Sequence, residues 1–149
     1  MLNGSSDIKV YETSSEEETY EIGRRFGEGA QAGSVFALEG DLGAGKTVFA
    51  KGFAAGLGIT EVISSPTFTI LQIYDSGRLE LYHYDAYRIE DPSEMEEIGY
   101  TDYFYGEGTS LIEWACNIEE YLPDHLTKIS IEKVPEKGFD YRRITVTEI

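Results

Sequence analysis

Apolar residues recur along this chain with two different spacings, and the changes between them outline its elements. The runs "DIKVYE" (7–12) and "GSVFALEG" (33–40) are short and rich in β-branched or aromatic residues, which is typical of strands. Residues 14–30 and 46–57 place apolar side chains three or four positions apart, the spacing of a helix with one buried face. The beginning of the chain therefore predicts a strand, a helix, a second strand and a second helix.

The rest of the chain is dominated by the two-residue period of strands. Residues 68–88 indicate two strands joined at "DSGR", and residues 126–149 a final hairpin that turns at "PEKGFD". Between these hairpins the pattern predicts, in order, a helix beginning at Asp91 or Ser93, the buried strand 109–114 and a short helix over 117–122. The order of elements predicts the α/β class, with a mixed sheet flanked by helices and antiparallel hairpins.

Composition narrows the class of protein. The 149 residues suit a single domain over 1–149, and a net charge of −16 repels phosphodiester backbones, so unaided nucleic-acid binding is not expected. Cys116 is the only cysteine, which excludes an intrachain disulfide, and with His83 and His125 it gives too few ligands for a structural zinc site. There is neither a signal-peptide pattern nor an apolar run near the ~20 residues of a membrane span. We expect a cytoplasmic protein without membrane association.

The segment "GDLGAGKT" (40–47) joins the second predicted strand to the second predicted helix. Gly40, Gly45, Lys46 and Thr47 fit the phosphate-binding pattern G-x-x-x-x-G-K-[ST] in the strand–loop–helix context that it requires. Glycines let backbone amides converge on phosphate oxygens, Lys46 reaches the β- and γ-phosphates, and the Thr47 hydroxyl binds Mg²⁺. A glycine turn before a lysine is the alternative, but roughly half a percent of chains this long would match by chance. The motif predicts a nucleotide site and a P-loop NTPase-like fold.

Nucleotide hydrolysis also needs a carboxylate at the metal and a group that orients water. Asp85 ends the predicted strand "LELYHYD", and Glu113 ends the predicted strand "SLIE". Ligands of open α/β sheets bind at the carboxyl ends of the strands, where either side chain could meet Mg²⁺. Because the chain has 28 acidic residues, an acid that only meets solvent is the alternative for each.

Two further features have a functional and a structural interpretation. The segment "SSPTFT" (64–69) offers the hydroxyls of Ser65 and Thr67 where nucleotide switches often sense the γ-phosphate, or it is a hydroxyl-rich turn. Trp114, the only tryptophan, packs in the core or lines a pocket for a nucleotide or a partner. The residues alone leave both pairs of alternatives open.

Four segments occur in one order with compatible gaps: "GDLGAGKT", "SPTFT", "YHYDAYR" and "LIEW". Together they resemble the small bacterial P-loop ATPase of tRNA threonylcarbamoyladenosine biosynthesis, the TsaE type, over about residues 7–149. The resemblance implies Mg²⁺-dependent ATP binding and hydrolysis in support of the complex that transfers a threonylcarbamoyl group to adenosine 37 of certain tRNAs. The implied partners are TsaB-type and TsaD-type subunits, so this chain would contact tRNA only indirectly.

The resemblance also implies roles for individual residues. The phosphates would be wrapped by Asp41, Leu42, Gly43, Ala44, Gly45, Lys46 and Thr47. Thr47 and Glu113 would bind Mg²⁺, and Asp85 would position the attacking water or a water on the metal; with Lys46, these two carboxylates form the implied catalytic set. Thr67 would lie in a switch-like segment. The family's nucleotide lies near the first helix and the last hairpin, so Ser15 and Arg142 or Arg143 are further candidates for its binding.

Three other functions share part of the pattern. A small nucleotide or metabolite kinase usually clamps its substrates with several arginines on a lid, and the six arginines here are not clustered near one. A GTPase would carry an N-K-x-D element for guanine, which the sequence lacks. A nucleotide-binding regulatory module that hydrolyses nothing remains compatible with the motifs.

Overall fold

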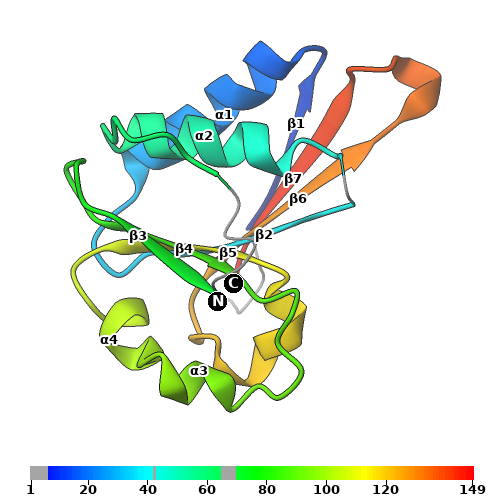
Figure 1. Cartoon of the computed structure of the whole chain (residues 1–149). Helices are drawn as coiled ribbons and strands as arrows, with labels where there is room; N and C mark the ends of the chain where they lie inside the picture. The colour runs from blue at the N-terminus through cyan, green and yellow to red at the C-terminus, as the bar shows by residue number, and fades with distance from the viewer. Residues whose placement is uncertain (1–6, 42, 65–69) are drawn as a thin grey trace.

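The computed structural model describes residues 7–41, 43–64 and 70–149, which form one seven-stranded sheet with helices on both faces (Figure 1). The strands are β1 (Asp7–Thr13), β2 (Val35–Gly40), β3 (Leu71–Tyr74), β4 (Leu81–Asp85), β5 (Thr109–Glu113), β6 (Thr127–Lys133) and β7 (Arg142–Glu148). The helices are α1 (Glu16–Gly29), α2 (Lys46–Gly56), α3 (Glu94–Glu97) and α4 (Tyr100–Phe104), with the 3₁₀ helices η1 (Ala115–Tyr121) and η2 (Pro135–Lys137).

The order of strands across the sheet is β1-β7-β6-β2-β5-β4-β3. The pairs β6–β2, β2–β5 and β5–β4 are parallel, whereas β3 pairs antiparallel with β4, and β7 pairs antiparallel with both β6 and β1. The predicted mixed α/β sheet with antiparallel strands at its edges is therefore confirmed. The carboxyl ends of the central parallel strands all meet at one edge of the sheet.

The helices α1 and α2 cover one face of the sheet and enclose the larger apolar core. Ser15 caps α1, because its Oγ accepts a hydrogen bond of 3.2 Å from the Glu18 amide. Three acidic residues in the first turn interact favourably with the positive end of the helix dipole. The two helices approach each other backbone to backbone. A Cβ at Gly27 would overlap the carbonyl oxygen of Phe53, and one at Gly52 would overlap that of Tyr20. This close crossing fixes α2 against α1.

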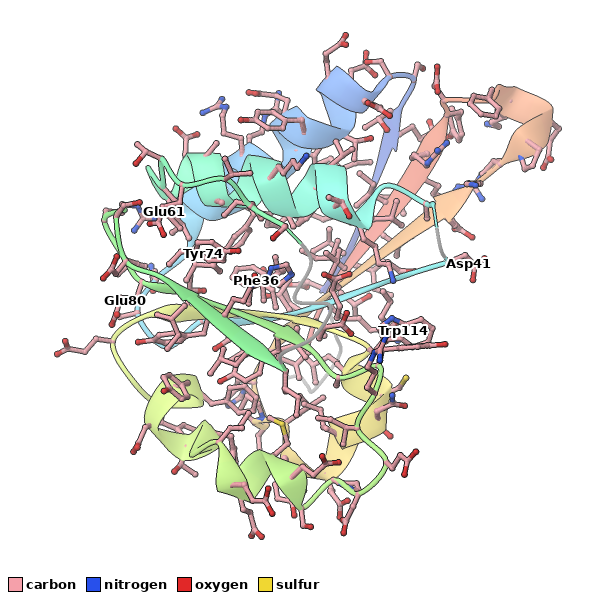
Figure 2. The ribbon with its side chains drawn as sticks, in the orientation of Figure 1. Phe36, Asp41, Glu61, Tyr74, Glu80 and Trp114 are labelled. Carbon is pink, nitrogen blue, oxygen red and sulfur yellow. The ribbon has the colours of Figure 1, made fainter. Side chains whose placement is uncertain are left out.

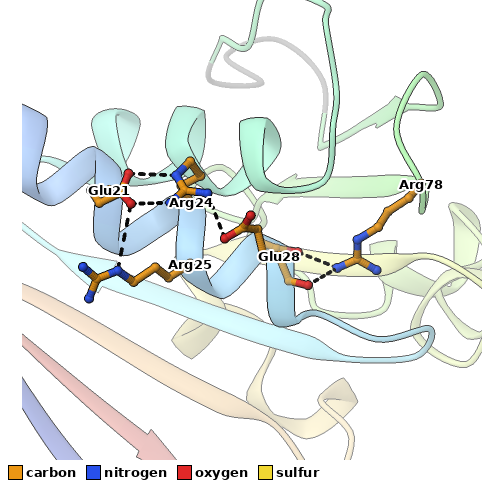
Figure 3. Close-up of polar contacts among 6 residues, drawn as sticks. Glu21, Arg24, Arg25, Glu28 and Arg78 are labelled. Atoms are coloured by element: carbon orange, nitrogen blue, oxygen red, sulfur yellow. Dashed lines mark hydrogen bonds and ion pairs between the residues drawn. The ribbon is translucent and has the colours of Figure 1, made fainter.

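The carboxyl end of α1 is capped by a residue from the turn between β3 and β4. Arg78 Nη2 donates to the carbonyl oxygens of Gly27, Glu28 and Ala30 at 2.7–2.8 Å. Figure 3 shows this contact beside the surface ion pairs of Arg24 with Glu21 and Glu28. The capping satisfies carbonyls that have no partner within the helix, and it ties the edge hairpin to the helical layer.

The opposite face of the central strands is covered by α3, α4 and η1, which enclose a second core rich in tyrosine. Burial raises the pKa of Tyr84, and burial with a hydrogen bond to Glu80 raises the pKa of Tyr82 to about 12, so both phenols stay neutral. The predicted helix start at Asp91 or Ser93 is confirmed, because Ser93 is the N-cap of α3. Gly99 then adopts a left-handed conformation (φ 69°) and separates α3 from α4. In the described parts of the chain no helix is long and apolar enough to cross a membrane.

Candidate functional site

The loop between β2 and α2 is opened by glycines. Gly43 and Gly45 have φ angles of 79° and 109°, which side-chain-bearing residues rarely adopt, and a Cβ at Gly40 would lie 2.6 Å from the carbonyl oxygen of Ile131. The N-cap residue of α2 is Gly45, which has no side chain to accept hydrogen bonds from the first backbone amides of the helix. Open amides at a helix N-terminus form a binding site for an anion.

Other residues of the predicted loop line the same turn. Asp41 is exposed, and its carbonyl oxygen accepts a hydrogen bond of 3.0 Å from the Ala44 amide, which closes the turn. Thr47 is exposed in the first turn of α2. Leu42 lies outside the described residues, as do Ser65 and Thr67 of the switch-like segment, so their predicted roles stay predictions.

Lys46 lies between a carboxylate and an aromatic ring. Its Nζ is 3.9 Å from Glu113 Oε1 and 5.0 Å from the centre of the Trp114 ring. The lysine comes from the first turn of α2, and the two partners come from the end of β5 and the residue after it. Lys46 therefore places an ammonium group on a flexible side chain beside the open amides, where a polyphosphate would compete with Glu113 for it.

The two predicted carboxylates end neighbouring parallel strands. Asp85 of β4 and Glu113 of β5 are paired in register, which places both side chains on the sheet face that α2 covers. The Glu113 side chain is 7% exposed, so this acid does not simply meet solvent, and its Oε2 lies 2.8 Å from His83 Nε2. Asp85 is half-buried, and its Oδ1 accepts a hydrogen bond of 2.9 Å from the Tyr87 amide.

Sequence reasoning missed His83, although a signal for it existed. In the strand "LYHYD" the two-residue period puts His83 on the same face as Asp85, and therefore on the face of Glu113. The histidine is 1% exposed, which is unusual for a residue of this type unless its ring nitrogens have a task.

Trp114 does not pack in the core. It is 38% exposed, its backbone has the left-handed angles φ 58° and ψ 38°, and its ring centre is 4.9 Å from that of Tyr87. Such backbone strain in a side-chain-bearing residue concentrates at functional sites. Figure 2 shows Trp114 and Asp41 on the same side of the molecule, beyond the ends of the strands. Of the two alternatives, packing in the core is therefore wrong, and the ring lies exposed beside Lys46.

The candidates outside the loop have different positions. Ser15 caps α1, as described above. Arg142 contacts the glycine loop between β2 and α2. Its Nε donates a hydrogen bond of 2.7 Å to the carbonyl oxygen of Ala44, and its Nη2 lies 3.5 Å from the carbonyl oxygen of Gly43. Arg143 points to the other face of the sheet, where its Nη1 is 3.9 Å from Glu132 Oε1. Of the two arginines, only Arg142 is joined to the site.

We predict that Arg142→Ala lowers both stability and nucleotide affinity. The change leaves the part-buried carbonyl of Ala44 without this donor, which costs about 1–3 kcal/mol of unfolding free energy, and it releases the loop that presents the amides. Arg143→Ala is the matched control, because this neighbouring arginine lies on the other face of the sheet in an exposed ion pair with Glu132, and its removal should change stability by less than about 1 kcal/mol. Urea unfolding of both variants, with and without ATP, checks the prediction; equal effects would refute it.

The donor set fits a magnesium ion bound together with a polyphosphate. A hydroxyl on Thr47 and a carboxylate on Glu113 are oxygen ligands, which Mg²⁺ prefers, and Mg²⁺ commonly takes one or two protein ligands beside phosphates and waters. No three His, Cys, Asp or Glu side chains gather as a preformed metal centre within residues 7–41, 43–64 and 70–149. The residues present thus suit a metal that arrives with its nucleotide.

Comparison with known proteins identifies the family. The model of a family described as "Threonylcarbamoyl adenosine biosynthesis protein TsaE" matches residues 13–144. The chain is 50% identical over 139 residues to the tRNA threonylcarbamoyladenosine biosynthesis protein TsaE of Bacillus subtilis, covering 93% of this chain and 85% of the relative. It is 42% identical over 132 residues to the protein of that name from Treponema pallidum, covering 89% and 95%.

A solved structure agrees with this result. The crystal structure of Bacillus subtilis YdiB matches with a TM-score of 0.84 at 42% sequence identity, covering 99% of this chain and 89% of that one. The matched region contains the glycine loop, both strand-end carboxylates and Trp114, so the resemblance drawn from the four motifs is confirmed. The chain belongs to the TsaE family.

Proposed function

We propose that this chain acts in tRNA threonylcarbamoyladenosine biosynthesis as a magnesium-dependent ATPase. The observation that carries the proposal is the arrangement of Lys46 3.9 Å from Glu113, beside the open amides of the glycine loop. A loop of this kind with a lysine and a nearby carboxylate suits a nucleoside triphosphate and its metal. The names of the relatives supply the pathway, and the motifs favour ATP over GTP.

Each residue has a chemical task in this proposal. The amides of the loop and Lys46 bind the β- and γ-phosphates, and Lys46 leaves Glu113 and Trp114 to do so. Thr47 and Glu113 hold Mg²⁺, which neutralises charge on the phosphates when it is bound. Asp85, fixed by the Tyr87 amide, positions the attacking water or a water on the metal. Little else is required of the protein, because phosphoryl transfer depends mainly on positioning and charge.

The surface charge supports an indirect relation to tRNA. Residues 89–127, which include α3, α4 and η1, contain no lysine or arginine, and all of their eleven acidic side chains except Glu113 are exposed or partly exposed. A phosphodiester backbone is repelled by such a surface. We therefore propose that TsaB-type and TsaD-type subunits contact the tRNA, and that this chain works through them.

Reconstitution of the tRNA modification with and without this chain tests the proposal. We expect slow, magnesium-dependent ATP hydrolysis by the isolated chain, a changed rate with the partner subunits, and repeated rounds of modification only when the chain is present. Phosphate transfer to a small acceptor without an effect on tRNA would support a kinase instead. Nucleotide binding without phosphate release, even with both partners, would support the regulatory module.

A further inference from the structure

His83 lies beneath Glu113 on β4, the second strand from one edge of the sheet. Its ring is 1% exposed, and its position on β4 is paired in register with Leu111 of β5. The neighbouring positions on this face, Leu81 and Leu111, are apolar and fully buried. A leucine would complete this apolar layer without a polar group to satisfy, so packing alone does not explain a histidine here.

The contact with Glu113 gives the imidazole a role. His83 Nε2 is 2.8 Å from Glu113 Oε2, while the other oxygen, Oε1, is the one that faces Lys46. A hydrogen bond to one oxygen of a carboxylate restricts the orientation of the side chain and so fixes the direction of the second oxygen. In Glu113 this second oxygen, Oε1, points toward Lys46 and the glycine loop.

The hydrogen bond also determines the tautomer of the ring. An ionised carboxylate only accepts, so Nε2 must carry the hydrogen and donate it, which leaves Nδ1 unprotonated in a neutral ring. Among the described residues, Nδ1 is buried and has no hydrogen-bond partner. In the described part of the chain, the polar contact of the ring is therefore the one that Nε2 makes with Glu113.

We propose that His83 is a positioning residue for Glu113: its Nε2–H holds Oε2, so that Oε1 is presented to the metal that arrives with the nucleotide. This inference rests on the proposed ATPase function. The inference adds a buried residue that hydrogen-bonds to the proposed metal ligand Glu113. Removing a residue of this kind commonly changes metal affinity or activity ten- to hundredfold. The role differs from a structural contact because it predicts an effect on magnesium and little effect on metal-free nucleotide binding.

The first test needs no variant. The chain has only two histidines, and His125 is exposed, so long-range ¹H–¹⁵N spectra of histidine-labelled protein give two separable rings. We expect the buried ring in the Nε2–H tautomer. An Nδ1–H tautomer would overturn the proposal, because Nε2 would then have no hydrogen to donate to Glu113.

The second test uses a matched pair of amide substitutions. In His83→Gln the amide nitrogen is as many bonds from Cβ as Nε2, whereas in His83→Asn it takes the place of Nδ1 and cannot reach Glu113. Trp114, the only tryptophan and the neighbour of Glu113, provides a fluorescence signal for binding of a non-hydrolysable ATP analogue, first in EDTA and then with increasing Mg²⁺. We expect His83→Gln to stay within about threefold of the parent, and His83→Asn to need roughly ten- to hundredfold more Mg²⁺ with unchanged binding in EDTA.

The outcomes separate this inference from the proposed function. If the parent binds the analogue with Mg²⁺ and both variants share its magnesium dependence, His83 has no positioning role and only this inference fails. If binding in EDTA falls equally in both variants, the histidine is structural, and the inference also fails. A parent that binds no nucleotide contradicts the proposed function itself, together with the inference that rests on it.

Discussion

Lys46→Ala is expected to weaken binding of ATP–Mg²⁺ by about a hundredfold or more, which corresponds to roughly 2.7 kcal/mol. Lys46 lies beside the open amides of the glycine loop, and a bound phosphate would replace its present contacts with Glu113 and Trp114. Without Lys46, the γ-phosphate would lose the ammonium group that comes from the first turn of α2. Isothermal titration with a non-hydrolysable ATP analogue measures the change.

Lys51→Ala is the control for this prediction. Lys51 is an exposed lysine on the same helix, so its removal changes the charge of the chain by the same amount without touching the loop. We expect the affinity of this variant to stay within about twofold, because exposed charges are screened. The phosphate-loop assignment would be wrong if Lys46→Ala bound ATP–Mg²⁺ as tightly as the parent chain.

The second large effect is expected from Glu113→Gln, which should lower the rate of ATP hydrolysis roughly a hundred- to thousandfold while nucleotide binding without metal changes little. The amide keeps the shape of the side chain and can still accept a hydrogen bond from His83, but it lacks the charge that holds Mg²⁺. Single-turnover phosphate release separates the rate of hydrolysis from the release of products.

Glu39→Gln provides the matched change at the end of the adjacent strand β2. This carboxylate makes an exposed ion pair with Lys128, 3.4 Å away, on the far face of the sheet, and its removal should leave hydrolysis unchanged. Asp85→Ala should also reduce hydrolysis if Asp85 orients the water. Full hydrolysis in both Asp85→Ala and Glu113→Ala, with ATP still bound, would disprove the assignment of these carboxylates.

Features that depend on near neighbours in the sequence could be predicted from it. The glycine loop is contiguous, Ser15 and the acidic turn after it form a local cap, and the alternation of strands is visible within a few residues. The start of α3 at Ser93 is such a local feature. Its early end was not predicted, because it depends on the left-handed backbone of Gly99.

Contacts between distant segments could not be predicted in the same way. His83 meets Glu113 thirty positions away because β4 and β5 are paired in a particular register, and a shift by one residue would turn either side chain to the other face. Arg142 reaches the loop 98 positions earlier because β7 runs antiparallel to β6 at the same edge of the sheet. The exposure of Trp114 depends on its strained backbone, which no periodicity reports.

The close crossing of α1 and α2 has a consequence for affinity. Glycines on both helices, Gly23 and Gly27 on one and Gly52 and Gly56 on the other, each face a backbone carbonyl that leaves no room for a side chain. The end of α2 that carries the open amides is therefore held rigidly by this helix crossing before any ligand binds. A triphosphate that binds there would not have to order this helix, so none of the binding free energy would be lost in ordering it.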